Sequence, residues 1–246
     1  PSLHYVLSEG SYYLGSDIKL TKSIHIREGV QLCLNGFSII SDGTVTGRHV
    51  IIVEGSSLTL TDCKGSGKIT HADGKNGGGV SVYNPSSVFN MFGGIITGNN
   101  IDGGVKNNGT FNMYGGEISG NTATNCGGGV YVAEYSTVFK VSGSAKITGN
   151  WTGSSNSTYS ADKANNVYLP QGKKLTVGTL ATGANIGVTT AEKPEGSKTV
   201  TIASSVGELN YENYVKADDS ENYKTQMDGA DLVLAVKNVT PPAQGH

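Results

Sequence analysis

Short runs in which apolar and polar residues alternate occur along most of the chain, and each run ends near a glycine or an asparagine. Such alternation is typical of a strand with one buried side, whereas a helix would place apolar residues three and four positions apart. The clearest part repeats itself: residues 89–99 return as residues 111–121 and, more loosely, as residues 139–150. Glycine and asparagine at the breaks suit tight corners. The pattern therefore predicts many short strands joined by tight turns.

The spacing of the repeats indicates the fold class. Successive repeats are offset by 22 and 28 residues, and a Gly-Gly-Val or Gly-Gly-Gly-Val element opens each of them. A propeller blade would need about 40 residues for its four strands, and a helical repeat would need a helical apolar pattern. Each unit instead holds three strand-like runs. We therefore predict an all-β fold, a single-stranded right-handed parallel β-helix (a solenoid) with three short strands per coil, about six to nine coils and capped ends.

Equivalent positions in successive coils are predicted to form ladders of like side chains. Each coil of a β-helix lies about 4.8 Å above the previous one, so the repeat brings equivalent residues into contact. Three ladders are expected inside the coil, and a fourth at a corner, made of asparagines that tolerate a left-handed backbone. Their members are Phe89, Phe111 and Phe139; Met91, Met113 and Val141; Ile96, Ile118 and Ile147; and Asn99, Asn121 and Asn150.

A single domain accounts for residues 1–238. Within it we expect irregular N-terminal coils over residues 3–75, regular repeats over 76–150, and C-terminal coils with a cap over 151–238, because a solenoid must protect the unpaired strand edge at each end. Residues 239–246 are polar and contain two prolines, as in a linker or an added tail. The chain starts without methionine, so we expect a piece of a longer protein whose signal, anchor and flanking domains lie elsewhere.

Charge and hydropathy exclude two kinds of partner. The formal net charge is -2, only 15% of the residues are charged, and the lysines and arginines form no run. Nucleic-acid binding depends on clustered lysine and arginine that neutralise phosphates. No apolar run approaches the roughly 20 residues of a membrane span. We therefore expect no nucleic-acid partner and no membrane insertion.

No cofactor and no metal site are expected. The histidines are scattered, no Cys-x-x-Cys pair occurs, and the Gly-Gly units lack the periodic aspartate of calcium-binding repeats. Cys33 and Cys63 are expected on diagonal neighbours, roughly 8 Å apart, which exceeds the reach of about 7 Å between α-carbons that a disulfide allows. Together with Cys126 they are predicted to be free thiols.

Several motifs carry a resemblance to known repeat regions. They are the strings at residues 30–36 and 58–63, the Gly-Gly-Gly-Val and Phe-x-Met-x-Gly-Gly-x-Ile-x-Gly-Asn units, and the strings at residues 166–170 and 186–189. Together they resemble the right-handed β-helix repeat regions of large, adhesin-like surface or secreted proteins, which are common in gut-dwelling Gram-positive bacteria. The resemblance implies an extracellular or cell-surface location. It implies no single activity, since related β-helices serve as adhesin stalks, sugar-binding surfaces and scaffolds of polysaccharide-degrading enzymes.

Five aromatic residues are the candidate ligand-binding positions. Burying Phe89 and Met91 turns Phe92 outward, and the same alternation turns Tyr114 outward directly above it. Aromatic rings on a rigid sheet can stack on the apolar face of a sugar ring. The remaining candidates, at neighbouring outward positions or next to a corner, are Tyr83, Tyr131 and Trp151. The alternative is that Phe92 and Tyr114 pack on each other and that Trp151 packs beneath the loop that follows it.

Three functions are therefore compared. The first, which we expect, is a non-catalytic module that binds glycans or a host surface glycoprotein at the mucosa. The second is a rigid spacer that holds other domains off the cell wall. The third is a fragment of a carbohydrate-active lyase or glycosidase, which would need paired carboxylates. The carboxylates available to the enzyme do not recur in one register, and they are Asp62, Asp73, Asp102, Glu117 and Glu134.

Overall fold

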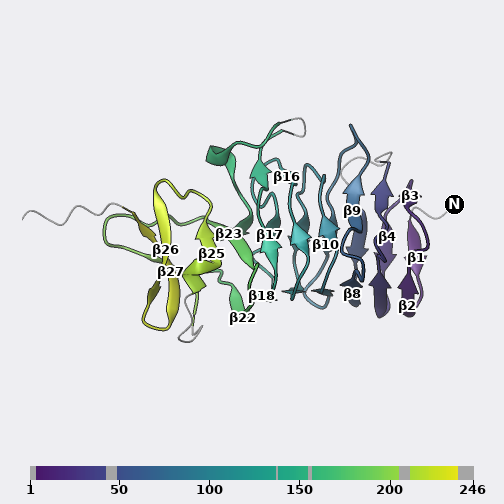
Figure 1. Cartoon of the computed structure of the whole chain (residues 1–246), viewed down its shortest axis with the longest axis horizontal. Helices are drawn as coiled ribbons and strands as arrows, with labels where there is room; N and C mark the ends of the chain where they lie inside the picture. Colours follow the sequence, from purple (N-terminus) through teal and green to yellow (C-terminus); the bar gives the residue numbers. More distant parts are fainter. Residues whose placement is uncertain (1–3, 43–48, 137, 155–156, 205–210, 238–246) are drawn as a thin grey trace, which may run out of the picture.

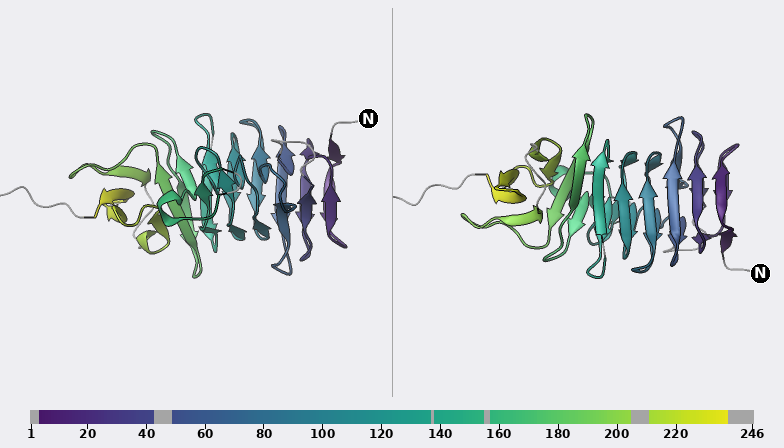
Figure 2. Two further views of the ribbon diagram at one scale, coloured as in Figure 1. Left: turned by 90° about the horizontal axis from the view of Figure 1, so that it is seen from above. Right: turned by 90° about the horizontal axis from the view of Figure 1, so that it is seen from below.

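The protein is a parallel β-helix, as the repeats predict. The computed structural model describes residues 4–42, 49–136, 138–154, 157–204 and 211–237. Strands stack one above another along the long axis of the molecule, with the N-terminal coils at one end and the C-terminal strands at the other (Figure 1). The same stacking is visible when the molecule is turned to show its upper and lower sides (Figure 2). Within the described residues, strand pairs along the coils are parallel and join equivalent strands of successive coils.

Each coil contributes one strand to each of three faces, here named face 1, face 2 and face 3. Face 2 has seven strands, so the described chain forms seven coils. Face 1 contains β1 (Tyr5–Leu7), β4 (Ile24–Ile26), β7 (Ile51–Val53), β10 (Val80–Val82), β13 (Val105–Asn107), β17 (Val130–Val132) and β21 (Val167–Leu169). Face 2 contains β2 (Gly10–Tyr13), β5 (Val30–Cys33), β8 (Ser57–Thr61), β11 (Val88–Met91), β14 (Thr110–Met113), β18 (Val138–Gly143) and β22 (Thr176–Leu180). Face 3 contains β3 (Ile18–Leu20), β6 (Ile39–Ser41), β9 (Lys68–His71), β12 (Ile95–Ile96), β15 (Glu117–Ile118), β19 (Lys146–Ile147) and the start of β23 (Asn185–Thr190).

The C-terminal end of the solenoid is closed by a change of topology. The first part of β23 pairs with β19 and its last part pairs with β21, so faces 3 and 1 fuse there. Beyond this point β25 (Val215–Ala217) extends the sheet, and an antiparallel sheet of β24 (Val200–Ala203), β26 (Tyr223–Asp228) and β27 (Asp231–Val236) covers the end. Ile202, Leu232 and Leu234 of this sheet belong to the continuous core.

The remaining elements lie outside the three faces. A two-stranded sheet of β16 (Thr122–Ala123) and β20 (Trp151–Thr152) follows face 3 in successive coils. Two short 3-10 helices, η1 (Ala161–Lys163) and η2 (Tyr211–Asn213), have three residues each. None of the helices within the described residues is long and apolar enough to cross a membrane.

The predicted apolar ladders form the core. Phe89, Phe111 and Phe139 pair in register, and their rings stack with centroids 4.9 and 5.0 Å apart. Each of the three side chains is at most 2% exposed. The predicted methionine and isoleucine ladders are in register as well, on faces 2 and 3. Burial of about 25 cal/mol per Å² of apolar surface makes these ladders the main stabilising term.

The predicted asparagine ladder also forms. The side-chain amide of Asn99 donates to Oδ1 of Asn121, and that of Asn121 donates to Oδ1 of Asn150, at 2.9 Å each. Their side chains are at most 1% exposed. One detail of the prediction is wrong: the left-handed backbone belongs to the preceding glycines, with φ near +65° at Gly98 and Gly120, and not to the asparagines. Glycine takes this conformation at lower cost, which frees each asparagine to point inward.

The ladder extends further than the repeats. Asn150 donates to Oδ1 of Asn166 at 2.9 Å, and Asn166 donates to the Asp218 carboxylate at 2.6 Å. At the other end, Nδ1 of His71 lies 3.0 Å from Oδ1 of Asn99 and therefore donates a hydrogen bond to it. Each side-chain to side-chain hydrogen bond of the ladder therefore runs from its donor toward the C-terminal end. Burial raises the pKa of Asp218, against the opposing effect of hydrogen bonds from Asn166 and Thr189.

Cys33, Cys63 and Cys126 are free thiols, as predicted. The sulfurs of Cys33 and Cys63 nevertheless lie 3.7 Å apart, so these two side chains meet despite the offset expected from the sequence. The prediction assumed that the strand continues through Cys63. Instead β8 ends at Thr61, and the Asp62 carboxylate accepts hydrogen bonds from the backbone amides of Lys64 and Gly67, which turns the chain.

The inward and outward assignment of face 2 can be tested with two substitutions in one coil. Phe111→Ala removes a fully buried ring and should lower the free energy of unfolding by about 3–5 kcal/mol. Tyr114→Ala removes a partly exposed ring and should cost less than about 1 kcal/mol. Chemical denaturation of both variants measures the difference, and equal losses would show that the assignment is wrong.

The asparagine ladder can be tested in the same way. Asn121→Ala removes the oxygen that accepts from both the backbone amide and the side-chain amide of Asn99, and it removes one donor to Oδ1 of Asn150. These buried losses should cost about 3 kcal/mol. Asn112→Ala, in the same coil, removes a half-buried amide on the outer side of face 2 that donates to Asn90. This matched control should cost less than about 1 kcal/mol. Comparable losses in the two variants would contradict a special role for the inner ladder.

Candidate functional site

The five predicted aromatic residues do not converge on one surface. Phe92 and Tyr114 follow β11 and β14 at the edge of face 2, whereas Tyr131 lies in β17 and Tyr83 follows β10, both on face 1. Trp151 lies in β20, outside the three faces. Because the outer sides of different faces point in different directions, no single ligand of ordinary size contacts all five.

Phe92 and Tyr114 point outward and stack on each other, as predicted. Their centroids are 4.5 Å apart, the ring planes differ by 18°, and Phe92 is 52% exposed. The stacking hides the ring faces that oppose each other, and Lys140 from the next coil lies over the Tyr114 ring at 5.9 Å. Sugar stacking needs a free ring face. Both faces of the Tyr114 ring are therefore covered, which favours the packing alternative for Tyr114, whereas Phe92 has a stacked neighbour on one face only.

Trp151 is engaged with the loop that follows it. Its indole nitrogen donates to the Ser157 hydroxyl at 3.0 Å, and its ring meets Tyr159 edge-on with centroids 5.9 Å apart. The residue is only partly exposed. These contacts favour the packing interpretation for Trp151.

Tyr131 borders a depression on face 1. Outward side chains of successive strands form a column in which Ser81, Lys106, Tyr131 and Tyr168 are neighbours in register. Tyr131 stacks on Tyr168 with centroids 6.0 Å apart and nearly parallel rings. Its opposite face is therefore turned toward Lys106 and the depression. The depression measures about 250 Å³, and its lining consists of Ile101, Asp102, Lys106, Ala123, Asn125, Cys126 and Tyr131.

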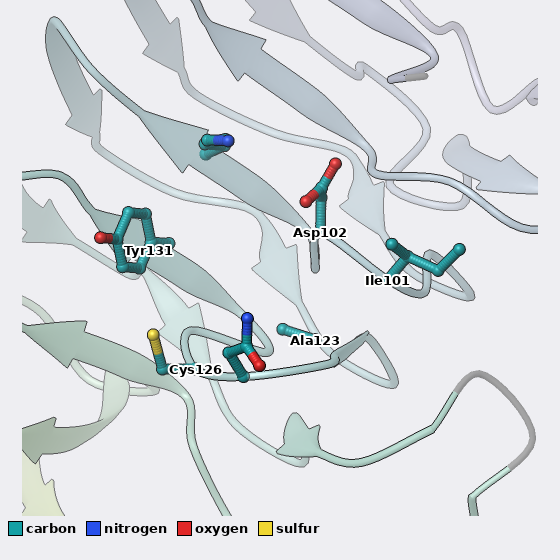
Figure 3. A pocket seen from close by; sticks show the side chains of 7 residues that line it. Ile101, Asp102, Ala123, Cys126 and Tyr131 are labelled. Atoms are coloured by element: carbon teal, nitrogen blue, oxygen red, sulfur yellow. The ribbon is translucent and has the colours of Figure 1, made fainter. Parts of the chain in front are cut away.

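Figure 3 shows how this lining is arranged. Tyr131 stands on one side, Asp102 and Ile101 on the other, and Ala123 and Cys126 lie along the lower side. The Tyr131 ring comes from face 1, whereas Asp102 comes from the corner between face 3 and the next strand of face 1. A strand and a corner loop thus form the two walls.

A second depression continues the first toward the N-terminus. It measures about 290 Å³ and shares Asp102 and Lys106 with the first. Its lining consists of His49, Ile52, Ser81, Tyr83, Asp102, Lys106 and Asn108. The two depressions form one groove along the coil axis, here called the face 1 trough. The trough contains two of the predicted aromatic residues, Tyr83 and Tyr131. It also contains Lys106, Asp102 and the side-chain amides of Asn108 and Asn125, which the sequence analysis did not group with them.

Glycine allows the walls of the trough to approach closely. A β-carbon on Gly103 would lie 2.4 Å from the carbonyl oxygen of Gly127, and one on Gly78 would lie 2.5 Å from the ring of His49. Larger residues at either position would push neighbouring coils apart. Ile101 adopts φ = +82°, which is unusual for a β-branched residue and carries strain that its neighbours must offset. The Gly-Gly elements of the repeat therefore shape this surface.

Three ionisable side chains of the trough, those of His49, Cys126 and Tyr131, have shifted pKa values. Burial lowers the pKa of His49 to about 4; Asp102 opposes this shift, whereas Lys106 and His71 add to it. His49 is therefore neutral at neutral pH, and its Nε2 has no hydrogen-bond partner among the described residues. Burial raises the pKa of the Cys126 thiol and, together with nearby groups, that of Tyr131. Both remain protonated at neutral pH, so Cys126 is not an activated nucleophile.

The candidate catalytic carboxylates are mostly dispersed. Asp62 and Glu117 line one depression of about 350 Å³ at the corner between faces 2 and 3, together with Lys146. The Asp62 carboxylate accepts backbone hydrogen bonds, including those from Gly36 and Gly67 at 2.7 Å. Glu117 accepts a hydrogen bond from the Ser119 hydroxyl at 2.6 Å.

The other three acids lie elsewhere. Asp73 and Glu134 are exposed in different loops, and Asp102 lies in the trough. Among the described residues, no group of three or more histidine, cysteine, aspartate and glutamate side chains is placed to hold a metal ion.

The low pKa of His49 predicts a loss of stability in acid. An unfolded histidine has a pKa of about 6.5, so as the pH falls the unfolded chain binds a proton before the folded chain does. Protonation of His49 leaves the free energy of unfolding unchanged above about pH 7. It lowers this free energy between about pH 6.5 and the folded-state pKa of about 4. His49→Gln should reduce this fall by about 3 kcal/mol, as measured by urea denaturation across that range. Part of the fall remains because burial also lowers the pKa of His71. If the free energy of unfolding falls equally with pH in His49→Gln and in the unmodified chain, the low pKa is wrongly assigned to His49.

Comparisons with known proteins leave the site without a precedent. No protein-family model, no curated protein and no solved structure matches the chain. The function must therefore be inferred from the residues of the trough and the properties of the fold.

Proposed function

We propose that the chain is a non-catalytic, adhesin-like module of a secreted or cell-surface protein, and that it binds a glycan in the face 1 trough. The single observation that carries the proposal is the position of Tyr131. One face of its ring borders an open groove that also presents a carboxylate, an ammonium group and side-chain amides. This combination of groups suits a sugar.

Sugar rings combine an apolar face with a rim of hydroxyl groups. The free face of Tyr131 offers a stacking surface for the apolar side. Asp102 accepts hydrogen bonds, Lys106 donates them, and the amides of Asn125 and Asn108 do both. The two depressions, of about 250 and 290 Å³, are each smaller than an ordinary ligand pocket of about 300–1,000 Å³. Because they adjoin and share Asp102 and Lys106, an extended glycan chain would occupy both and run parallel to the coil axis.

The rigidity of the fold supports binding to such a shallow groove. Tyr131 and Lys106 are anchored on adjacent strands whose inward neighbours Val130 and Val105 are completely buried. A preorganised surface loses little conformational entropy when the ligand binds. This reduces the affinity that individual contacts must supply.

The expected partner is a glycan of a host surface glycoprotein, and flanking domains of the same longer chain would supply anchoring. The rigid-spacer alternative uses the same stacked coils and needs no ligand. A glycosidase would need two carboxylates across the scissile bond. Asp102 is the single carboxylate among the described residues that line the trough, which disfavours catalysis there.

The proposal predicts the outcome of a glycan-array screen with paired variants. The unmodified chain should bind a defined set of glycans, and Tyr131→Ala and Lys106→Ala should each weaken that binding about tenfold, since stacking or a charged hydrogen bond contributes on the order of 1 kcal/mol or more. The double variant Phe92→Ala/Tyr114→Ala serves as the matched aromatic control and should bind like the unmodified chain.

Other outcomes would reject parts of the proposal. Binding lost only in the Phe92→Ala/Tyr114→Ala variant would move the site to face 2. If neither the unmodified chain nor any variant binds a glycan, the rigid-spacer function is favoured. Release of new reducing ends from a bound glycan would show that the module is an enzyme.

A further inference from the structure

A pair of thiols joins two adjacent coils near the N-terminal end of the solenoid. Cys33 is the last residue of β5, and Cys63 lies two residues beyond β8, in the next coil. Their sulfurs are 3.7 Å apart, which is close to van der Waals contact, and both thiols are free. A disulfide has a sulfur–sulfur distance of about 2.05 Å, so the two sulfurs must approach each other by about 1.7 Å to form one.

The surroundings of the pair favour a reaction between the two thiols. Burial alone would raise the pKa of Cys33, but hydrogen bonds to its sulfur, from the Cys63 backbone amide first and then from Thr61 and Asn35, lower it overall. The pKa of Cys63 is raised, mainly by its hydrogen bond to Cys33. Cys33 is therefore the better thiolate. Cys63 is exposed to solvent, and Cys33 is partly exposed, so a reagent can reach both.

We propose that Cys33 and Cys63 are an oxidation site that forms an inter-coil disulfide on exposure to a small-molecule disulfide such as oxidised glutathione. The Cys33 thiolate attacks one sulfur of the reagent, forms a mixed disulfide and releases one glutathione thiolate. The Cys63 thiol then loses its proton and attacks the Cys33 sulfur, which releases the second glutathione. The protein loses two hydrogen atoms, and the reagent is reduced to two thiols.

The position of the cross-link gives it a function in the fold. Solenoid coils contact only their neighbours, so the terminal coils are held by one interface each. The first coil contains the edge strands β1, β2 and β3, and Tyr13 of β2 is 76% exposed. A disulfide between the second and third coils would stop fraying of the N-terminal end from spreading into the repeats. In an oxidising compartment it would act as a permanent cross-link.

The test is oxidation of the complete chain with oxidised glutathione, followed by alkylation, intact mass measurement and peptide mapping. The three free thiols should fall to one, with a mass loss of two hydrogens and a cross-linked pair of peptides that contain Cys33 and Cys63. Cys126→Ser should form the same cross-link and retain no free thiol. The melting temperature of the oxidised chain should rise by about 5 °C or more and return after reduction.

Two controls make the result decisive. Cys33→Ser and Cys63→Ser should show neither the cross-link nor the reversible shift in melting temperature. The proposal is overturned if oxidation yields only glutathione adducts or chain-to-chain disulfides. It is equally overturned if all three thiols survive in the folded chain while a denatured sample is oxidised.

Discussion

The asparagine ladder fixes how the coils of this protein stack. At the corner after face 3 each asparagine amide lies within hydrogen-bond distance of both the next side-chain amide and nearby backbone carbonyls. Nδ2 of Asn121, for example, is 2.8 Å from the carbonyl oxygen of Ile96. A buried corner without such partners would cost about 1–3 kcal/mol for each unpaired group. Because the ionised Asp218 carboxylate can only accept, it fixes the direction of the side-chain hydrogen bonds along the ladder, and Nδ1 of His71 is the donor at the other end.

The register that the asparagine ladder shares with the apolar ladders also creates the face 1 trough. Lys106 and Tyr131 are neighbours because Val105 and Val130 are paired in the core beneath them. A slip of one residue between coils would turn the outward side chains inward. The close approach at Gly103 and Gly78 then brings the corner residue Asp102 alongside this column. The shape of the trough and the fold therefore depend on the same repeated positions.

Much of the fold could be predicted from the repeats, because like residues at a constant offset must meet in a stacked coil. The phenylalanine and asparagine ladders follow directly from that rule. Asn166 and Asp218 could not be predicted as members of the asparagine ladder, since both lie outside the repeat: Asn166 directly precedes β21, and Asp218 directly follows β25. The turn at Asp62 was missed because the strand alternation was extended through Cys63, whereas the Asp62 carboxylate accepts hydrogen bonds from the amides of Lys64 and Gly67 and, in the preceding coil, of Gly36.

The candidate site was only partly predictable. The alternation correctly predicted that Phe92 and Tyr114 point outward, but it did not predict whether their ring faces stay free after stacking. Aligning the Gly-Gly-Val elements would have placed Ser81, Lys106 and Tyr131 in one column. Asp102 depends on the path of a corner loop, which no local pattern specifies.

The most direct test of the ladder is the hydrogen exchange of asparagine side-chain amides, measured by NMR on the folded chain. The account predicts that the amides of Asn99, Asn121 and Asn150 exchange as slowly as the buried backbone amides beside them, whereas that of Asn112 on face 2 exchanges much faster. If Asn121 exchanges as fast as Asn112, the inner ladder does not hold the coils together, and the register of the trough must have another origin.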